Sequence, residues 1–211
     1  MRMAESIGVI LAGGQSSRMG EDKAAMMFVG ETLLQRAVRR LSAAVDDVLV
    51  IGPSSLQPLV RDVRVVPDLV PGSGPLGGLY TALRSSTGAR IFLVACDMPF
   101  VQEGLVRAML ALSATNRDAE AVVLKESGAS KRMQPLHAVY AYACLPAIER
   151  ALATDDLSLR SLLAHLRVLT LDADTVRRED PRGLSALNVN TPEDWREALR
   201  MARELEAAGG G

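Results

Sequence analysis

The chain contains few of the residues that build disulfide frameworks and metal clusters. Its 211 residues include only two cysteines and two histidines. Cys96 and Cys144 each lie in an apolar stretch, without another cysteine or a histidine at the spacing of metal ligands. This scarcity argues against a zinc site and against a disulfide-stabilised scaffold.

A strong net charge and a long apolar run are lacking as well. Lysine and arginine number 24 against 25 aspartates and glutamates, which leaves a formal net charge of -1 at pH 7. This balance indicates neither a nucleic-acid surface nor a membrane surface, so we expect small molecules or other proteins as partners. The first apolar run, which follows Ser6, is too short for a signal peptide or a membrane span. We therefore expect a cytoplasmic protein.

The content of apolar residues, 48% of the chain, suffices for one substantial core. We predict a single domain over residues 1–208, a disordered tail at 209–211 and a monomer. No internal repeat and no linker divides the chain.

Short runs rich in Val, Ile and Leu recur and predict strands that are buried on both faces. They cover residues 7–12, 48–51, 63–66, 91–95, 121–124, 136–140 and 168–171. Segments with helical apolar spacing lie between many of them, at residues 33–41, 75–85, 102–114, 142–153 and 192–208. In the segment 33–41, we expect Arg36, Arg39 and Arg40 to lie on other sides of the helix than its apolar stripe.

This alternation predicts an α/β fold, a single Rossmann-like three-layer domain with a mostly parallel, partly mixed central sheet. The polar, basic stretch at 125–135 stands where a crossover helix is expected. We therefore expect the later strands to depart from simple parallel winding.

The stretch I-L-A-G-G-Q-S-S-R-M-G-E-D-K, at residues 10–23, follows the first predicted strand with glycines that suit close approach to a phosphate. It lacks the G-x-G-x-x-G spacing of a dinucleotide-binding loop, and its lysine is followed by Ala24 where a P-loop has Ser or Thr. What remains is a glycine turn with two cations, Arg18 and Lys23. The structural alternative is an ordinary strand-to-helix turn with solvated charges.

This stretch resembles the signature of the molybdenum cofactor guanylyltransferases, within the nucleotidyltransferase superfamily. Four further stretches are similar to the family in the same order. They are V-P-D at 66–68, G-P-L-G-G-L at 74–79, L-V-A-C-D-M-P-F at 93–100, and L-N-V-N-T-P-E-D at 187–194. Paired glycines at 13–14 and the turn at 74–78 favour a guanylyltransferase over a cytidylyltransferase by the same resemblance.

The resemblance implies a nucleotide-diphospho-sugar transferase type of fold and an Mg2+-dependent transfer of GMP from GTP to molybdopterin-bound molybdenum cofactor. Other cofactor-biosynthesis proteins are implied as partners. The implied catalytic residues are Arg18, Lys23 and Asp97. The implied nucleotide-binding residues are Leu11, Ala12, Gly13, Gly14, Lys23, Asp68, Gly77, Gly78 and Asp97. Asp97 is the implied metal ligand, and Asn188 and Asn190 are implied to bind the acceptor. The family's asparagine after the second strand is replaced here by Pro53-Ser54-Ser55.

Asp97 ends an apolar run, so we expect it at the carboxyl end of a buried strand, where ligands bind in open α/β sheets. A magnesium ion bridging nucleotide phosphates is one explanation, and the N-cap of the following helix is the other. Lys23 suits the α-phosphate, and Arg18 suits the β- and γ-phosphates.

Each remaining candidate also has a structural explanation. Asp68 suits the base or ribose, or a turn before Pro71. Asn188 and Asn190 suit the acceptor, or turns and caps. Basic residues at 125, 131 and 132 suit an acceptor phosphate, or simple solvation. His137 is expected to be a partly buried histidine with its hydrogen bonds satisfied.

Two other functions remain open on the sequence alone. The first is a nucleotidyltransferase with another nucleotide or acceptor, such as CTP or a sugar or polyol phosphate. The second is a nucleotide-binding regulatory protein without turnover.

Overall fold

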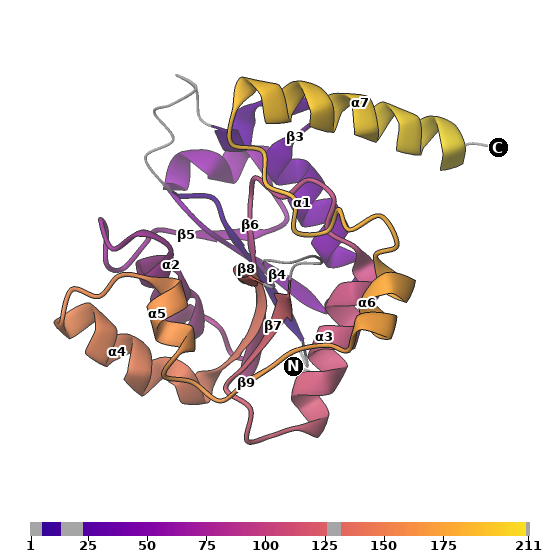
Figure 1. The fold of residues 1–211 in the computed structure, drawn as a ribbon. Coiled ribbons are helices and arrows are strands. Elements are labelled where there is room, and N and C mark those ends of the chain that lie inside the picture. Colours follow the sequence, from indigo (N-terminus) through magenta and orange to yellow (C-terminus); the bar gives the residue numbers. More distant parts are fainter. Residues whose placement is uncertain (1–5, 14–22, 126–131, 210–211) are drawn as a thin grey trace.

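The protein is seen in a computed structural model that describes residues 6–13, 23–125 and 132–209 (Figure 1). Among the residues singled out above, Gly14, Arg18 and Lys131 lie outside this described part. Helix α7 extends to Gly209, one residue into the predicted tail.

A seven-stranded sheet in the order β5-β4-β1-β6-β8-β7-β9 forms the centre of the molecule. Its strands are β1 (Ile7–Leu11), β4 (Asp47–Ile51), β5 (Arg64–Val66), β6 (Arg90–Ala95), β7 (Ala121–Lys125), β8 (Met133–Ala141) and β9 (Val168–Leu169). The strands from β5 to β6 run parallel, whereas β8 is antiparallel to both of its neighbours. The predicted mixed sheet is confirmed, and the departure from parallel winding begins after the basic stretch.

Helices cover both faces of this sheet and complete the three layers (Figure 1). One face packs against α1 (Leu33–Ser42), α3 (Glu103–Thr115), α6 (Ala173–Glu179) and α7 (Pro192–Gly209). The other face packs against α2 (Gly74–Ser85), α4 (Leu145–Ala153) and α5 (Leu159–Leu163). Helices α5 and α6 are short, and the sequence analysis missed them because their apolar periodicity spans too few turns.

Short elements connect these layers. Three 3₁₀ helices, η1 (Lys23–Ala25), η2 (Ser54–Leu59) and η3 (Tyr142–Cys144), lie in the connections. The short strands β2 (Met27–Phe28) and β3 (Glu31–Thr32) form an antiparallel hairpin that leads directly into α1. Thr32 begins that helix with a capping box, because its hydroxyl accepts from the Gln35 N–H and the Gln35 side chain accepts from the Thr32 N–H.

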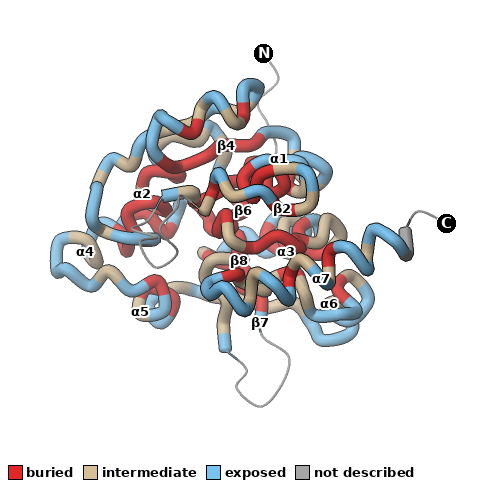
Figure 2. Tube along the Cα trace, turned by 90° about the horizontal axis from the view of Figure 1, so that it is seen from above, coloured by how far each residue is buried: buried red, intermediate tan, exposed pale blue. Residues whose placement is uncertain are grey.

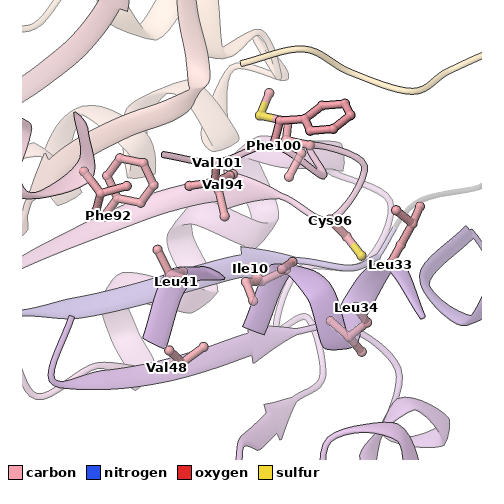
Figure 3. Close-up of a cluster of buried hydrophobic side chains, with 14 of the residues drawn as sticks. Ile10, Leu33, Leu34, Leu41, Val48, Phe92, Val94, Cys96, Phe100 and Val101 are labelled. Carbon is pink, nitrogen blue, oxygen red and sulfur yellow. The ribbon is translucent and has the colours of Figure 1, made fainter. Parts of the chain in front are cut away.

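The core follows from the apolar runs. All five residues of β1 are buried, and alternate side chains point to opposite faces, with Val9 toward α2 and Ile10 toward α1. Figure 2 shows the buried residues gathered along the strands and on the inner sides of the helices. Figure 3 shows Ile10 between Leu34, Leu41 and Val94 in the cluster under α1. Burial on both faces explains why these strands read as continuous apolar runs.

One residue departs from the predicted pattern of α1. The expectation that Arg36 lies away from the apolar side was wrong, because Arg36 is buried to 1% exposure. Its position three residues after Leu33 places it at the edge of the buried stripe. Among the described residues, no helix is long and apolar enough to cross a membrane.

Candidate nucleotide-binding and catalytic site

Asp97 lies directly beyond the carboxyl end of β6, in a loop that backbone hydrogen bonds hold firmly. The Cys96 N–H donates to the Leu11 carbonyl at the end of β1, at 3.0 Å. The Asp97 carbonyl accepts from the Val189 N–H at 2.9 Å. Asp97 therefore sits between the end of the first strand and the segment that leads to α7, as the apolar run before it predicted.

The explanation of Asp97 as a helix cap was wrong. The next helix, α3, begins at Glu103, and its N-cap residue is Gln102. The Asp97 carboxylate is thus left for another role.

The side chain of Lys23, the first residue of η1, reaches the Asp97 carboxylate. Its ammonium nitrogen Nζ lies 3.8 Å from Asp97 Oδ2. The same nitrogen donates to the Val189 carbonyl at 3.1 Å and to Asn190 Oδ1 at 3.2 Å. The side chains of Lys23 and Asp97 are 17% and 20% exposed, so a ligand can still reach both. The structure therefore brings together three of the predicted site residues, Lys23, Asp97 and Asn190.

The electrostatics of Asp97 suit a cation. Burial raises the pKa of this carboxyl, and the Lys23 ammonium only partly offsets the effect. Its Oδ1 atom is buried and has no hydrogen-bond partner among the described residues. An unpartnered, desolvated carboxylate oxygen is costly unless a cation or a donor completes it. A hard oxygen-binding ion such as Mg2+ fits this atom.

Asp97 does not belong to a larger cluster of metal ligands among the described residues. No group of three or more His, Cys, Asp or Glu side chains in metal-binding arrangement occurs in the described part of the chain. Magnesium commonly takes one or two carboxylates and completes its shell with water and substrate phosphates. The donor set around Asp97 is thus the kind that suits a metal carried by a nucleotide.

The segment before α7 combines a helix cap with a site residue. The backbone N–H groups of Asn190 and Thr191 donate to Asp194 Oδ2 at 3.0 and 2.9 Å, and the Asp194 N–H donates to Thr191 Oγ1 at 3.1 Å. The first of these bonds does most to lower the pKa of Asp194. Thr191 and Asp194 thus provide the cap, whereas Asn190 contributes only its backbone N–H to it and its side chain contacts Lys23. Asn188 lies elsewhere, in a hollow beside the first turns of α7.

Asp68 organises the loop between β5 and α2. Its Oδ1 atom accepts from the Thr81 hydroxyl at 2.8 Å and from the Val70 N–H at 3.0 Å. The Thr81 oxygen in turn accepts from the Leu69 N–H at 2.9 Å. The turn explanation for Asp68 is thus correct, and its contact with a nucleotide stays a prediction.

The glycines at the start of α2 allow close packing inside the protein. A Cβ atom on Gly77 would lie 2.8 Å from the Val70 carbonyl oxygen and 3.2 Å from Asp68 Oδ2. A Cβ atom on Gly78 would lie 2.9 Å from the Leu11 side chain. Because both glycines lack a side chain, the Asp68 loop and the end of β1 can pack against the first turn of α2. The contact of Gly77 and Gly78 with a nucleotide stays a prediction.

The carboxyl ends of β1 and β4 complete this edge. Leu11 is buried, Gly13 is exposed, and Ala12 donates its N–H to the Ile51 carbonyl at 2.8 Å. Beyond β4, Ser54 and Ser55 are exposed at the start of η2, where the resembled family carries an asparagine. The predicted nucleotide-binding residues that are described thus lie along one edge of the sheet.

Residues 8–171 match the family described as the MobA-like NTP transferase domain. The chain belongs to this family. A probable molybdenum cofactor guanylyltransferase of Pelotomaculum thermopropionicum is 35% identical over 200 residues, which cover 95% of each chain. A molybdenum cofactor guanylyltransferase of Desulfosudis oleivorans is 32% identical over 192 residues, covering 90% of this chain and 93% of the relative.

Two solved structures have the same fold as this chain. The molybdopterin-guanine dinucleotide biosynthesis protein A of Archaeoglobus fulgidus superposes with a TM-score of 0.80 at 23% identity, covering 94% of this chain and 99% of that chain. The 2-C-methyl-D-erythritol 4-phosphate cytidylyltransferase of Thermus thermophilus gives a TM-score of 0.64 at 20% identity, covering 93% and 98%. The predicted nucleotide-diphospho-sugar transferase type of fold is confirmed.

The structure adds residues to the site of this MobA-like chain that sequence reasoning missed. The Val189 backbone binds both Asp97 and Lys23, and Thr81 holds Asp68. A backbone contact leaves no sequence signal. Thr81 does carry one, because it is a polar residue on the buried side of α2.

His137 was expected to be partly buried, and it is in fact fully buried. Its Nε2 atom lies 2.7 Å from the Ser185 hydroxyl, and Nδ1 has no hydrogen-bond partner among the described residues. Burial lowers the pKa of His137 to about 4. The expectation that the hydrogen bonds of His137 are satisfied was therefore wrong for Nδ1, and the ring is neutral and enclosed.

Proposed function

We propose that this protein transfers GMP from GTP to molybdopterin-bound molybdenum cofactor, forming molybdopterin guanine dinucleotide and pyrophosphate. The observation that carries the proposal is the meeting of Lys23, Asp97 and Asn190 at the carboxyl edge of the sheet. The names of relatives at 32–35% identity over most of the chain support the choice of GTP and of the cofactor.

In this proposal the triphosphate lies over the ends of β1 and β6. The Lys23 ammonium leaves Asn190 Oδ1 and binds the α-phosphate, where negative charge develops during transfer. Arg18, which lies outside the described residues, binds the leaving phosphates through its guanidinium group. Asp97 would hold Mg2+, and the ion would supply positive charge that offsets the charge of the phosphates.

The chemistry needs no general base. An oxygen of the terminal phosphate of molybdopterin attacks the α-phosphorus of GTP, and a new phosphorus–oxygen bond forms as the bond to the β-phosphate breaks. The electron pair of the broken bond leaves with pyrophosphate. A phosphate monoester is mostly ionised near neutral pH because its second pKa is about 6. Positioning of the two substrates, with charge neutralisation by Lys23 and by a cation that Asp97 would hold, therefore accounts for catalysis.

Nucleotide and acceptor enter from different sides of this edge. Leu11, Ala12, Gly13 and Asp68 bind the nucleoside, with Gly77 and Gly78 holding their loops together. Asn188 and Asn190, on the segment before α7, bind the acceptor. We further propose that the enzyme works as a monomer in the cytoplasm, with other cofactor-biosynthesis proteins supplying the acceptor.

A nucleotide and acceptor panel tests this function. The purified protein is incubated with Mg2+, molybdenum cofactor and either GTP or CTP, and pyrophosphate and the dinucleotide are measured. We expect both products with GTP and neither with CTP. Transfer with CTP alone overturns the base assignment, and transfer only to a sugar or polyol phosphate overturns the acceptor. Stoichiometric GTP binding without transfer in a single turnover identifies a regulatory protein instead.

A further inference from the structure

Three aromatic side chains from the segments that carry Lys23, Asp97 and Asn190 form a cluster. The chain has three phenylalanines and one tryptophan, and all of these except Phe92 gather here. The Phe28 ring is 6.1 Å from the Phe100 ring and 5.5 Å from the Trp195 ring, both edge-to-face. Such pairs add stability and a defined geometry beyond their buried area.

Each ring of this cluster follows one site residue closely along the chain. Phe28 comes soon after Lys23, Phe100 after Asp97, and Trp195 after Asn190. The three segments are far apart in sequence, and their polar residues meet at the surface. Contacts among the rings therefore help to fix the relative positions of the three segments.

Arg36 ties this cluster together from α1. Its guanidinium carbon lies 5.0 Å from the centre of the Phe28 ring, in a cation–π arrangement. Its Nε–H donates to the Pro99 carbonyl at 2.9 Å, two residues after Asp97. Its Nη1 lies 3.2 Å from Glu31 Oε1 and 3.6 Å from Glu206 Oε1, on α7. One buried side chain thus contacts Phe28 and Pro99, which lie on the segments that carry Lys23 and Asp97, and a residue further along α7.

We infer that Arg36, stacked on Phe28, is a positioning residue that sets the place of Asp97 relative to Lys23. The inference rests on the proposed function for its catalytic consequence, but the positioning itself is a property of the free protein. The planar guanidinium group supplies the stacked face and a directed Nε–H at once, which a lysine cannot do. Loss of either contact frees the Asp97 loop on one side.

The alternative is that Arg36 serves overall stability alone. In that case its loss loosens the whole protein evenly, without a local effect at the two site segments. A matched arginine tests this distinction. Arg90 begins β6, at the opposite end of the strand that Asp97 follows, and donates to Ser113 Oγ at 2.8 Å and to the Arg117 carbonyl at 3.2 Å. Arg36→Lys and Arg90→Lys therefore make the same chemical change. Arg36 contacts the loop after β6, and Arg90 lies at the start of β6.

The experiment compares these variants with the wild type in three measurements. Hydrogen exchange without nucleotide reports the site segments 23–28 and 97–101, Mn2+ binding in the presence of GTP reports the metal site, and steady-state kinetics report kcat and KM. For Arg36→Lys we expect exchange at least about tenfold faster in both segments, weaker Mn2+ binding, and a fall in kcat of about a hundredfold with a smaller change in KM. Arg90→Lys should leave both segments and the Mn2+ affinity unchanged.

Exchange in 23–28 and 97–101 that matches the wild type in Arg36→Lys overturns the inference. Exchange that rises evenly over the whole chain does the same. If Arg36→Lys does not fold, Phe28→Leu removes the stacked ring from the other side, and the same outcomes apply. If the wild type neither binds Mn2+ with GTP nor transfers GMP, the proposed function fails, and the exchange comparison still decides the role of Arg36.

Discussion

The ammonium nitrogen of Lys23 lies 3.8 Å from Asp97 Oδ2, and both residues are held by the backbone of Val189. Both side chains are mostly buried, and a separation of 3.8 Å repays little of the cost of taking the two charges out of water, so stability does not explain the pair. Its position instead leaves one cation and one carboxylate ready for a ligand at the ends of β1 and β6. The predictions below follow from that arrangement.

Removal of the lysine should affect turnover far more than folding. In Lys23→Ala, the α-phosphate loses its main cation, and we expect kcat to fall about 10²- to 10³-fold. The melting temperature should fall only slightly, because Asp97, whose pKa is raised by burial, can take up a proton once its counter-charge is lost. Arg203→Ala, on the exposed side of α7, is the control and should keep full activity. A wild-type rate in pure Lys23→Ala removes this residue from the mechanism.

Replacement of the carboxylate should separate stability from metal binding. Asp97→Asn keeps the shape of the side chain and relieves the cost of a buried charge, so we expect an unchanged or higher melting temperature. Mn2+ binding with GTP should be lost, together with GMP transfer. Titration of Mn2+ by electron paramagnetic resonance measures this directly. Undiminished Mn2+ affinity in Asp97→Asn shows that the metal binds elsewhere.

Overpacking at the start of α2 should displace the Asp68 loop. A methyl group at Gly77 would lie 2.8 Å from the Val70 carbonyl, which belongs to backbone and cannot move alone. For Gly77→Ala we expect a loss of about 1–3 kcal/mol in stability and a raised KM for GTP. Gly88→Ala crowds Ile7 at 3.0 Å before β6, at the other end of the sheet, and serves as the control. An equal rise in KM in both variants contradicts a local effect on the loop.

The buried His137 should make stability depend on pH. Its pKa is lowered from 6.5 to about 4 in the folded protein, so below pH 6.5 the unfolded chain binds protons that the folded chain does not. The stability that the folded protein gains from the lowered pKa of His137 is complete above pH 6.5. It is lost as the pH falls toward 4, by about 3 kcal/mol in total. Urea unfolding between pH 4 and 7 should therefore show a shallower pH dependence in His137→Gln than in the wild type.

His165, the second histidine, is exposed and provides the matched control. His165→Gln should follow the wild-type dependence of unfolding free energy on pH. Identical pH dependences for His137→Gln and the wild type would show that His137 titrates normally in the folded protein.

Sequence patterns predicted the sheet and the position of Asp97 because continuous apolar runs record strands buried on both faces. They also placed Lys23 and Asn190 in the site, through resemblance to a family whose spacing this chain retains. Burial of Arg36 was not predictable, since an arginine on an amphipathic helix normally faces solvent. The pairing of Asp68 with Thr81 depends on a loop geometry that residue spacing does not encode.

A crystal structure of the protein with GTP and Mn2+ tests the central claim most directly, because the anomalous signal locates the metal. We predict Mn2+ bound to Asp97 and to phosphate oxygens, with the Lys23 ammonium moved from Asn190 Oδ1 to the α-phosphate. A triphosphate bound away from the ends of β1 and β6, or a metal without contact to Asp97, would contradict the account.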